Sequence, residues 1–173
     1  TYGEEYGLEA NIDTIKSIRD KNVFASLTYE KKCGVLEAII LCEAHQLGLP
    51  EIKIKFKKLN DEIAGQSDWI TNTITINEEA VKKGKAESLL ETCCHESRHI
   101  FQGMMCSIYR KISPEQRNLQ AFTKDDVAGW VLNYENYIED SIYYGSQPLE
   151  TDARDYAYSR VLEYYTDIDE LVQ

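Results

Sequence analysis

Apolar residues recur at helical spacing along both ends of this 173-residue chain. The first such repeat consists of Leu8, Ile12, Ile15 and Ile18. It predicts one helix after a loose end over residues 1–7. A second helix is predicted to begin after Thr28, whose hydroxyl suits an N-cap, and to end at Gly48. Gly48 can adopt the left-handed backbone that closes a helix, and Pro50 prevents continuation.

The spacing changes to alternation in the middle of the chain. Residues 52–57, IKIKFK, alternate apolar side chains with lysine, as a half-exposed strand does. Residues 69–77, WITNTITIN, are rich in β-branched side chains and predict a second strand. One face of that strand is expected to carry Ile70, Asn72, Ile74 and Ile76. The segment between the strands, which contains Asn60, Asp61 and Gly65, is predicted to be a loop.

Helical spacing returns after residue 77 and continues to the C-terminus. Helices are predicted over residues 78–84, 85–110 and 123–138, and from Pro148 onward. Strands grouped between helices predict an α+β fold with a small antiparallel or mixed sheet. No repeat or linker divides the chain, so we expect a single domain over residues 1–173. Its parts would be N-terminal helices (1–49), strands (50–84) and the helices that carry the candidate chemistry (85–173).

Composition narrows the possible partners and compartments. Nineteen basic residues against thirty acidic ones give a net charge of −11, so nucleic acid is not an expected partner, whereas cations are attracted. No apolar run approaches the roughly 20 residues that span a bilayer, so no membrane association is expected. Five cysteines, none in a CxxC pair, favour free thiols in a reducing compartment. We therefore expect a cytoplasmic protein, although the start at Thr1 is also compatible with a removed signal peptide.

Residues 95–99, HESRH, form the motif HExxH on the predicted helix 85–110. His95 and His99 lie one turn apart on one face, with Cβ atoms about 5–6 Å apart, so both imidazoles can reach one Zn²⁺. Glu96 projects from the neighbouring face, where it can act as a general base without binding the metal. The main apolar stripe of this helix lies nearly opposite the histidines, which share their face with Thr92, Gln102 and Cys106. The stripe consists of Ala86, Leu89, Leu90, Cys93, Ser97, Ile100, Phe101, Met104 and Ile108.

HExxH on a helix that follows a strand resembles the zincin metallopeptidases. A metzincin would carry a third histidine where this chain has Met105. The only other histidine, His45, lies far upstream and is expected to have a structural role. The third ligand is therefore expected to be a carboxylate from a later helix, as in the gluzincins.

The segment PLETDARDYA resembles the glutamate-bearing helix of small soluble gluzincins from phages and mobile elements. The residues that match are Glu150, Ala153, Tyr156 and Ala157. This resemblance implies that Glu150 is the third ligand. Asp152 offers the same chemistry, but it falls roughly 200° around the helix from Glu150. The side of Glu150 instead continues as the apolar stripe Ala153, Ala157, Val161, Tyr164 and Ile168.

The resemblance implies a zinc-dependent endopeptidase that binds one Zn²⁺ through His95, His99 and Glu150, with Glu96 as catalytic base. Its partner would be a protein or peptide substrate, extended along the edge of the Ile70–Ile76 strand. Candidates for a helper of the developing oxyanion are Tyr137, Tyr143 and Tyr144. Two alternatives stay open: a non-catalytic zinc-binding domain on the same frame, and a structural module without metal.

Overall fold

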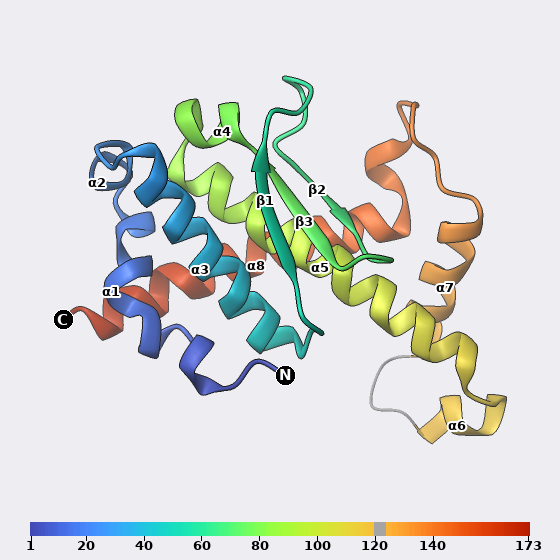
Figure 1. The fold of residues 1–173 in the computed structure, drawn as a ribbon. Helices are drawn as coiled ribbons and strands as arrows, with labels where there is room; N and C mark the ends of the chain where they lie inside the picture. Colours follow the sequence, from blue (N-terminus) through green and yellow to red (C-terminus); the bar gives the residue numbers. More distant parts are fainter. Residues whose placement is uncertain (120–123) are drawn as a thin grey trace.

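The computed structural model describes residues 1–119 and 124–173 (Figure 1). The N-terminal elements are η1 (Glu4–Tyr6), η2 (Glu9–Asn11), α1 (Ile12–Ile15), η3 (Lys16–Arg19), α2 (Lys21–Ala25) and α3 (Tyr29–Leu47). The central elements are β1 (Lys53–Lys57), β2 (Gly65–Asp68), β3 (Thr73–Asn77) and α4 (Glu78–Lys83). The C-terminal elements are α5 (Ala86–Lys111), α6 (Pro114–Leu119), α7 (Lys124–Glu135), η4 (Tyr144–Ser146) and α8 (Pro148–Leu171).

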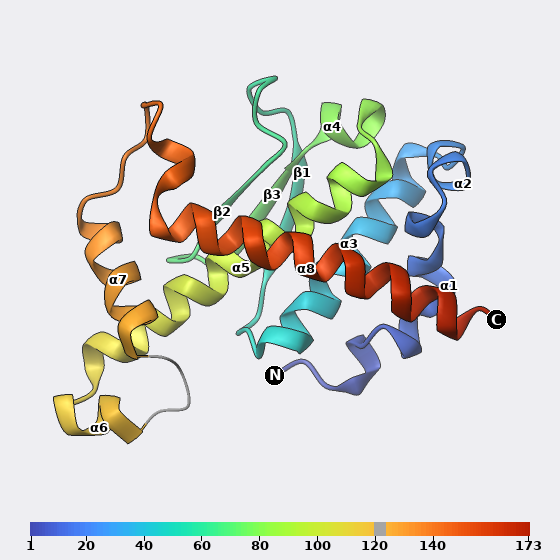
Figure 2. The ribbon, with the colours of Figure 1, turned by 180° about the vertical axis from the view of Figure 1, so that it is seen from behind.

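The three strands form a mixed sheet in the order β1-β3-β2, with β1 parallel and β2 antiparallel to β3. The long helix α5 packs against α3, α8 and β2. Figures 1 and 2 show that the sheet and α8 lie on opposite sides of α5, while α7 stands at the end of α5 away from α1. The predicted α+β class is confirmed.

Local signals set the ends of α3 as predicted. The Thr28 hydroxyl accepts a hydrogen bond from the backbone N–H of Lys31, and Gly48 has φ of 65°. Pro148 occupies the first position of α8, where its missing N–H costs no hydrogen bond. Within the described ranges, no helix has an apolar stretch long enough to cross a membrane.

The apolar stripes of α5 and α8 form the centre of the core. All five residues predicted to continue the side of Glu150 on α8 are buried, and Ala153 and Ala157 are fully covered. Small side chains at these two positions allow the backbones of α5 and α8 to approach closely. On α5, Leu90 and Ile100 are fully buried, whereas Ile108, at the far end of the predicted stripe, is exposed.

The structure corrects the prediction for the strands. The second strand begins at Thr73 rather than at Trp69, because residues 69–72 form a turn in which Asn72 has φ of 52°. Ile70 is therefore exposed to solvent rather than part of a strand face. The segment predicted to be a loop contains β2, which the structure pairs with β3.

The pairing of β3 rules out the predicted position of an extended substrate. β3 is the central strand, and its two edges are already bonded to β1 and β2. A peptide therefore cannot add to the Ile70–Ile76 segment. The open sheet edge beside α5 belongs to β2 instead.

Three further predictions were wrong in their local detail. The first predicted helix is divided into η2, α1 and η3. Residues 1–7 are not a loose end, because the Tyr2 hydroxyl accepts a hydrogen bond from the Ile52 N–H and its carbonyl contacts His45 Nδ1. Helix α7 ends at Glu135, before the predicted end at residue 138, and Thr123 at its predicted start lies outside the described residues.

Candidate metal centre

Three side chains from two helices converge at the surface where α5 meets the start of α8. His95 and His99 lie on α5, and Glu150 lies in the first turn of α8. The two Nε2 atoms are 3.1 Å apart. Glu150 Oε2 lies 3.2 Å from Nε2 of His95, and Oε1 lies 3.3 Å from Nε2 of His99. Among the described residues, this is the group of histidine, cysteine and carboxylate side chains whose donor atoms are close enough to hold one metal ion.

These distances fit a tetrahedral zinc site. Ligands at about 2.0 Å from a tetrahedral ion lie about 3.3 Å from one another. The two histidine nitrogens are 3.1 Å apart, close to one edge of that tetrahedron, and each has a different oxygen of Glu150 at 3.2 or 3.3 Å. Two imidazole nitrogens and a carboxylate oxygen also form a donor set that zinc favours, and three protein ligands leave one position open. The residues present therefore fit the ion that the motif implies.

Gln102 orients the imidazole of His99. Its amide nitrogen donates to the Leu149 carbonyl at 2.9 Å and to Asp152 at 2.8 Å, which fixes the direction of the amide group. The amide oxygen then accepts a hydrogen bond from Nδ1 of His99 at 2.8 Å. With its proton on Nδ1, neutral His99 presents the lone pair of Nε2 to the centre.

Asp152 is held in turn by Arg98. The guanidinium donates to both carboxylate oxygens, at 2.8 and 3.1 Å, and it lies over the rings of Phe101 and Tyr156. Asp152 therefore contacts the centre only through Gln102, as its place on the helix predicted. These contacts also tie α5 to α8 beside the three donors.

The start of α8 is anchored by α7. The side-chain oxygen of Asn133 accepts a hydrogen bond from the Leu149 N–H at 3.0 Å, and its nitrogen donates to the Gln147 side chain. The Tyr137 hydroxyl, just beyond α7, donates to Glu150 Oε1 at 2.6 Å. Glu150 is thus held both through its backbone neighbours and through its own carboxylate.

The charges at the centre are strongly coupled. Burial alone would lower the pKa of His99, but the hydrogen bond to Glu150 and the charges of Glu96 and Glu150 raise it to about 9. Burial alone would raise the pKa of Glu150, but hydrogen bonds from His95 and His99 hold it well below its ordinary range. Without metal, Glu150 is an anion that favours a cation between its neighbours. A proton on His99 supplies that charge, and a divalent ion would replace it.

Glu96 lies beside the three donors without belonging to them. The residue is only 8 % exposed. No hydrogen bond connects its carboxylate to any residue in ranges 1–119 and 124–173. Gly65 of β2 lies so close that a Cβ atom there would be 3.3 Å from Glu96 Cγ and 2.8 Å from Thr92 Cγ2. The glycine therefore lets β2 pack directly onto α5 at the site.

Two cavities lie beside the centre, and Glu96 lines both of them. The first, of about 430 Å³, is lined by His99, Glu150 and β2, together with Trp69, Tyr134, Tyr137 and Tyr144. The second, of about 670 Å³, is lined by His95 and by the loop before β2. Both are lined by Glu96, Gly65, Ile63 and Tyr144. A molecule in either cavity can therefore reach Glu96 and one histidine.

The three tyrosines predicted as oxyanion helpers have different positions. Tyr137 contacts Glu150, and its pKa is raised by burial and by hydrogen bonds to Glu150 and Tyr144, so it stays a neutral donor. Tyr144 lines both cavities beside Glu96. Tyr143 is exposed and lines neither cavity. The structure thus leaves Tyr137 and Tyr144 within reach of the centre.

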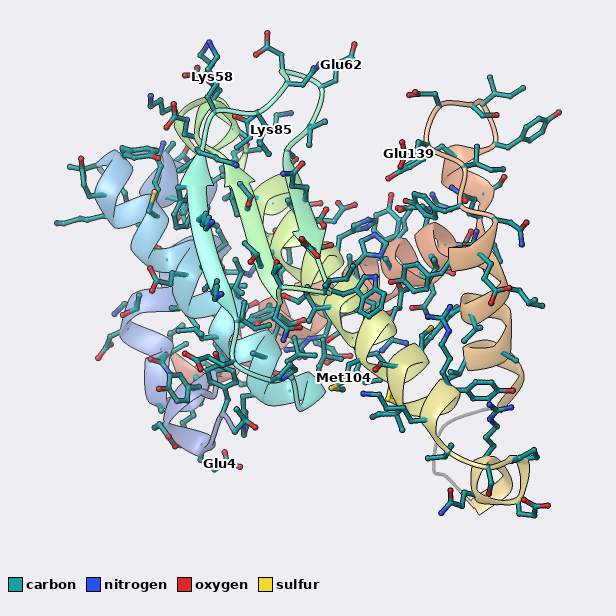
Figure 3. All side chains as sticks on the ribbon, turned by 45° about the vertical axis from the view of Figure 1, so that its right-hand side comes forward. Glu4, Lys58, Glu62, Lys85, Met104 and Glu139 are labelled. Atoms are coloured by element: carbon teal, nitrogen blue, oxygen red, sulfur yellow. The ribbon has the colours of Figure 1, made fainter. Side chains whose placement is uncertain are left out.

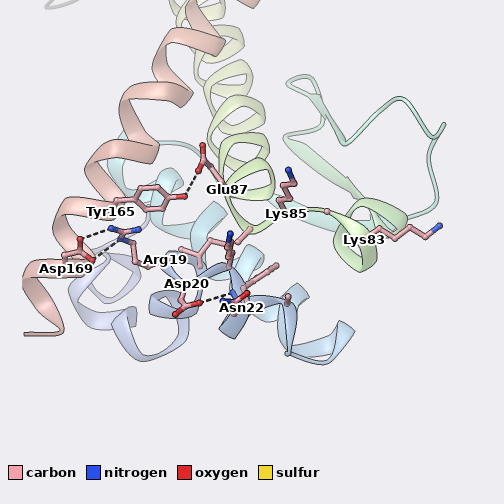
Figure 4. Close-up of a pocket in the computed structure, with 14 residues that line it drawn as sticks. Arg19, Asp20, Asn22, Lys83, Lys85, Glu87, Tyr165 and Asp169 are labelled. Atoms are coloured by element: carbon pink, nitrogen blue, oxygen red, sulfur yellow. Dashed lines mark hydrogen bonds and ion pairs between the residues drawn. The ribbon is translucent and has the colours of Figure 1, made fainter.

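A cavity of about 830 Å³ lies elsewhere, at the start of α5 (Figure 4). It contains none of the three donors. Its charged groups are largely paired: Arg19 contacts Asp169 through two hydrogen bonds, and Tyr165 donates to Glu87. We therefore place the candidate chemistry at the centre on α5 and α8.

Sequence reasoning missed the residues that support the centre. Gln102 follows His99 by three positions, so a shared helix face was a signal for its contact. Its contacts with Leu149 and Asp152 required the position of α8 and had no local signal. Comparison of the chain with protein-family models, curated proteins and solved structures finds no match.

Proposed function

We propose that this protein is a zinc-dependent endopeptidase, with His95, His99 and Glu150 as ligands and Glu96 as general base. The observation that carries this proposal is the position of Glu96. Glu96 is only 8 % exposed, its carboxylate has no hydrogen-bond partner among the described residues, and it lines two cavities next to a group of metal donors. Such a carboxylate is suited to accept a proton during a reaction.

Zinc at the three donors would supply a Lewis acid that polarises a peptide carbonyl and makes water more acidic. Glu96 is placed to take a proton from water in the adjoining cavities and to deliver it to the leaving amine. Tyr137 holds Glu150 by its hydrogen bond, and Tyr144 offers a neutral hydroxyl beside Glu96. Gln102 keeps the proton of His99 on Nδ1, away from the centre.

The edge of β2 offers a place for the substrate backbone. β2 forms one border of the sheet, and its Gly65, Gln66 and Ser67 line the cavity that contains His99 and Glu150. An extended peptide can add to such an edge through backbone hydrogen bonds. This placement would bring a peptide bond across the centre, between the two cavities.

The test compares the wild type with Glu96→Gln, using a library of peptides derived from a whole proteome. The amide cannot accept the proton, so we expect zinc content and folding to be retained and cleavage to be lost. Glu87→Gln, on the same helix but at the distant cavity, serves as the matched control and should cleave as the wild type does. Identical cleavage products from the wild type and Glu96→Gln would exclude Glu96 as the base. Absence of cleavage by a zinc-loaded wild type would favour the non-catalytic alternative.

A further inference from the structure

The cavity on the His95 side of the centre is strongly acidic. Its walls come from α5, from the loop between β1 and β2, and from the segment between α7 and η4. Five carboxylates line it: Glu62, Glu91, Glu96, Glu139 and Asp140. No lysine or arginine does. Figure 3 shows Glu62 on the β1–β2 loop and Glu139 on the segment that faces it, on opposite sides of this space.

These carboxylates are not neutralised within the chain. No ion pair connects Glu62, Glu91, Glu139 or Asp140 to a basic side chain in the described part of the structure. Ordinary surface carboxylates are paired or dispersed, whereas these converge on one concave space. Like charges gathered in this way raise the local concentration of cations.

A second observation points to a ligand in the same space. Glu96 is only 8 % exposed, and it lines this cavity without a hydrogen-bond partner among the described residues. Its carboxylate is therefore available to a hydrogen-bond donor or a cation that enters the cavity. The cavity therefore combines an acidic wall with a largely buried carboxylate that has no partner among the described residues.

The spacing of the carboxylates favours an organic cation over a metal ion. Among the described residues, only the donors of His95, His99 and Glu150 approach one another closely enough to share an ion. The other carboxylates are spread over about 670 Å³, which suits a long side chain with a charged end. The cavity that contains His99 and Glu150 is different in kind, because four aromatic residues line it.

We propose that the acidic cavity is a substrate subsite that binds a lysine or arginine side chain beside the scissile bond. This assignment rests on the proposed peptidase function. A substrate strand on the edge of β2 would pass from the aromatic cavity to the acidic one as it crosses the centre. The preferred substrates are therefore segments with a basic residue on one side of the cleaved bond and an apolar or aromatic residue on the other.

The experiment is a cleavage screen with the zinc-loaded wild type and a combinatorial peptide library, read by mass spectrometry. We expect lysine and arginine to be enriched about tenfold at one fixed position next to the cleaved bond, which is the effect of one charge-assisted contact. The variant Glu91→Gln/Glu139→Gln/Asp140→Asn should lose this enrichment while it still cleaves. Its matched control is Glu37→Gln/Glu170→Gln/Asp155→Asn, which removes the same charge from exposed positions outside the cavity and should keep the enrichment.

The outcomes separate this inference from the peptidase proposal. Cleavage without basic enrichment, or with equal enrichment in both triple variants, would overturn the subsite and leave the peptidase intact. If the wild type cleaves nothing, the test is the affinity of the zinc-loaded protein for the hydroxamates of N-acetyl-lysine and N-acetyl-norleucine. These compounds bind to zinc through the hydroxamate and need no turnover. A lysine compound that binds about tenfold more tightly would support the subsite. Equal affinity of the two compounds would overturn it.

Discussion

Helix α8 contributes to two buried charged clusters. They differ in whether their charged groups find partners within the chain. Three turns after Glu150, Arg160 lies against Glu43 of α3, whose side chain is fully buried. Glu43 accepts hydrogen bonds from the Arg160 guanidinium, at 2.7 to 3.1 Å, and from the hydroxyls of Tyr156 and Tyr164. Every oxygen of this carboxylate has donors, so the cluster is complete within the chain.

The donor atoms of the metal centre do not have such separate partners within the chain. His95, His99 and Glu150 direct donor atoms at one another rather than at separate partners. Only a proton or a cation between them removes the repulsion of their lone pairs. Cavities reach this group and Glu96, whereas Glu43 has no exposed surface. A buried charge alone is therefore no sign of function, but donors that converge beside accessible space are.

The sharpest test of this contrast replaces the two carboxylates at the start of α8, one at a time. Glu150→Ala should lower zinc affinity about a thousandfold, because one of three protein ligands is lost. Asp152→Ala should lower it no more than about tenfold, since Asp152 acts only through Gln102. Titration with a zinc-sensitive competitor measures both. The reverse order would mean that Asp152, not Glu150, binds the metal.

Substitutions in the cluster of Glu43 and Arg160 should instead change the stability of the protein. Glu43→Ala leaves Arg160 buried without its main partner and should cost about 3–5 kcal/mol of unfolding free energy, measured by urea denaturation of the metal-free protein. Its control is Glu163→Ala, which removes the exposed partner of Arg160 and should cost no more than about 1 kcal/mol. Both variants should keep wild-type zinc affinity if they fold. A large loss of zinc affinity in folded Glu43→Ala would show that the two clusters are not independent.

The orientation of His99 gives a smaller effect. Gln102→Ala should lower zinc affinity about 10- to 100-fold, because His99 loses the acceptor that holds its proton on Nδ1. Nitrogen NMR of the metal-free protein at high pH should show the proton shared between the two ring nitrogens. Gln66→Ala, in the same cavity but away from His99, should change neither quantity. An unchanged zinc affinity in Gln102→Ala would show that Gln102 does not orient His99 for metal binding.

The smallest effect for a single step of one pH unit is the dependence of zinc affinity on pH. His99 has a raised pKa of about 9, so its proton is present in the metal-free protein at neutral pH and must leave when zinc binds. Affinity should therefore rise by about tenfold per pH unit between roughly pH 6 and 8. Calorimetry in buffers of different ionisation enthalpy should detect about one proton released. Uptake without proton release would show that His99 carries no such proton in the metal-free protein.

Parts of the fold that depend on one helix at a time were predictable. The wheel of α8 separated Glu150 from Asp152 and gave the buried stripe, because helical periodicity alone decides which residues share a face. Cys106 shows the limit of that reasoning. The wheel placed it on the polar face, but α7 packs there, so Cys106 is buried in a second cluster with Val127 and Trp130.

Features that depend on neighbours in space were not predictable. The sequence GQSD of β2 has no apolar alternation, so its pairing with β3 and its packing on α5 make it a strand. The same holds for the candidate site. HExxH is visible locally, whereas the contacts of Gln102 and the acidic cavity combine segments that lie far apart in the chain.

The most direct test of the metal centre is the zinc content of protein purified without added metal. Elemental analysis of the wild type should find about one zinc per chain, and the double variant His95→Ala/His99→Ala should contain none while its circular dichroism stays helical. A wild type that neither contains zinc nor takes it up on titration would contradict the assignment of the zinc site. A double variant that carries as much zinc as the wild type would contradict it equally.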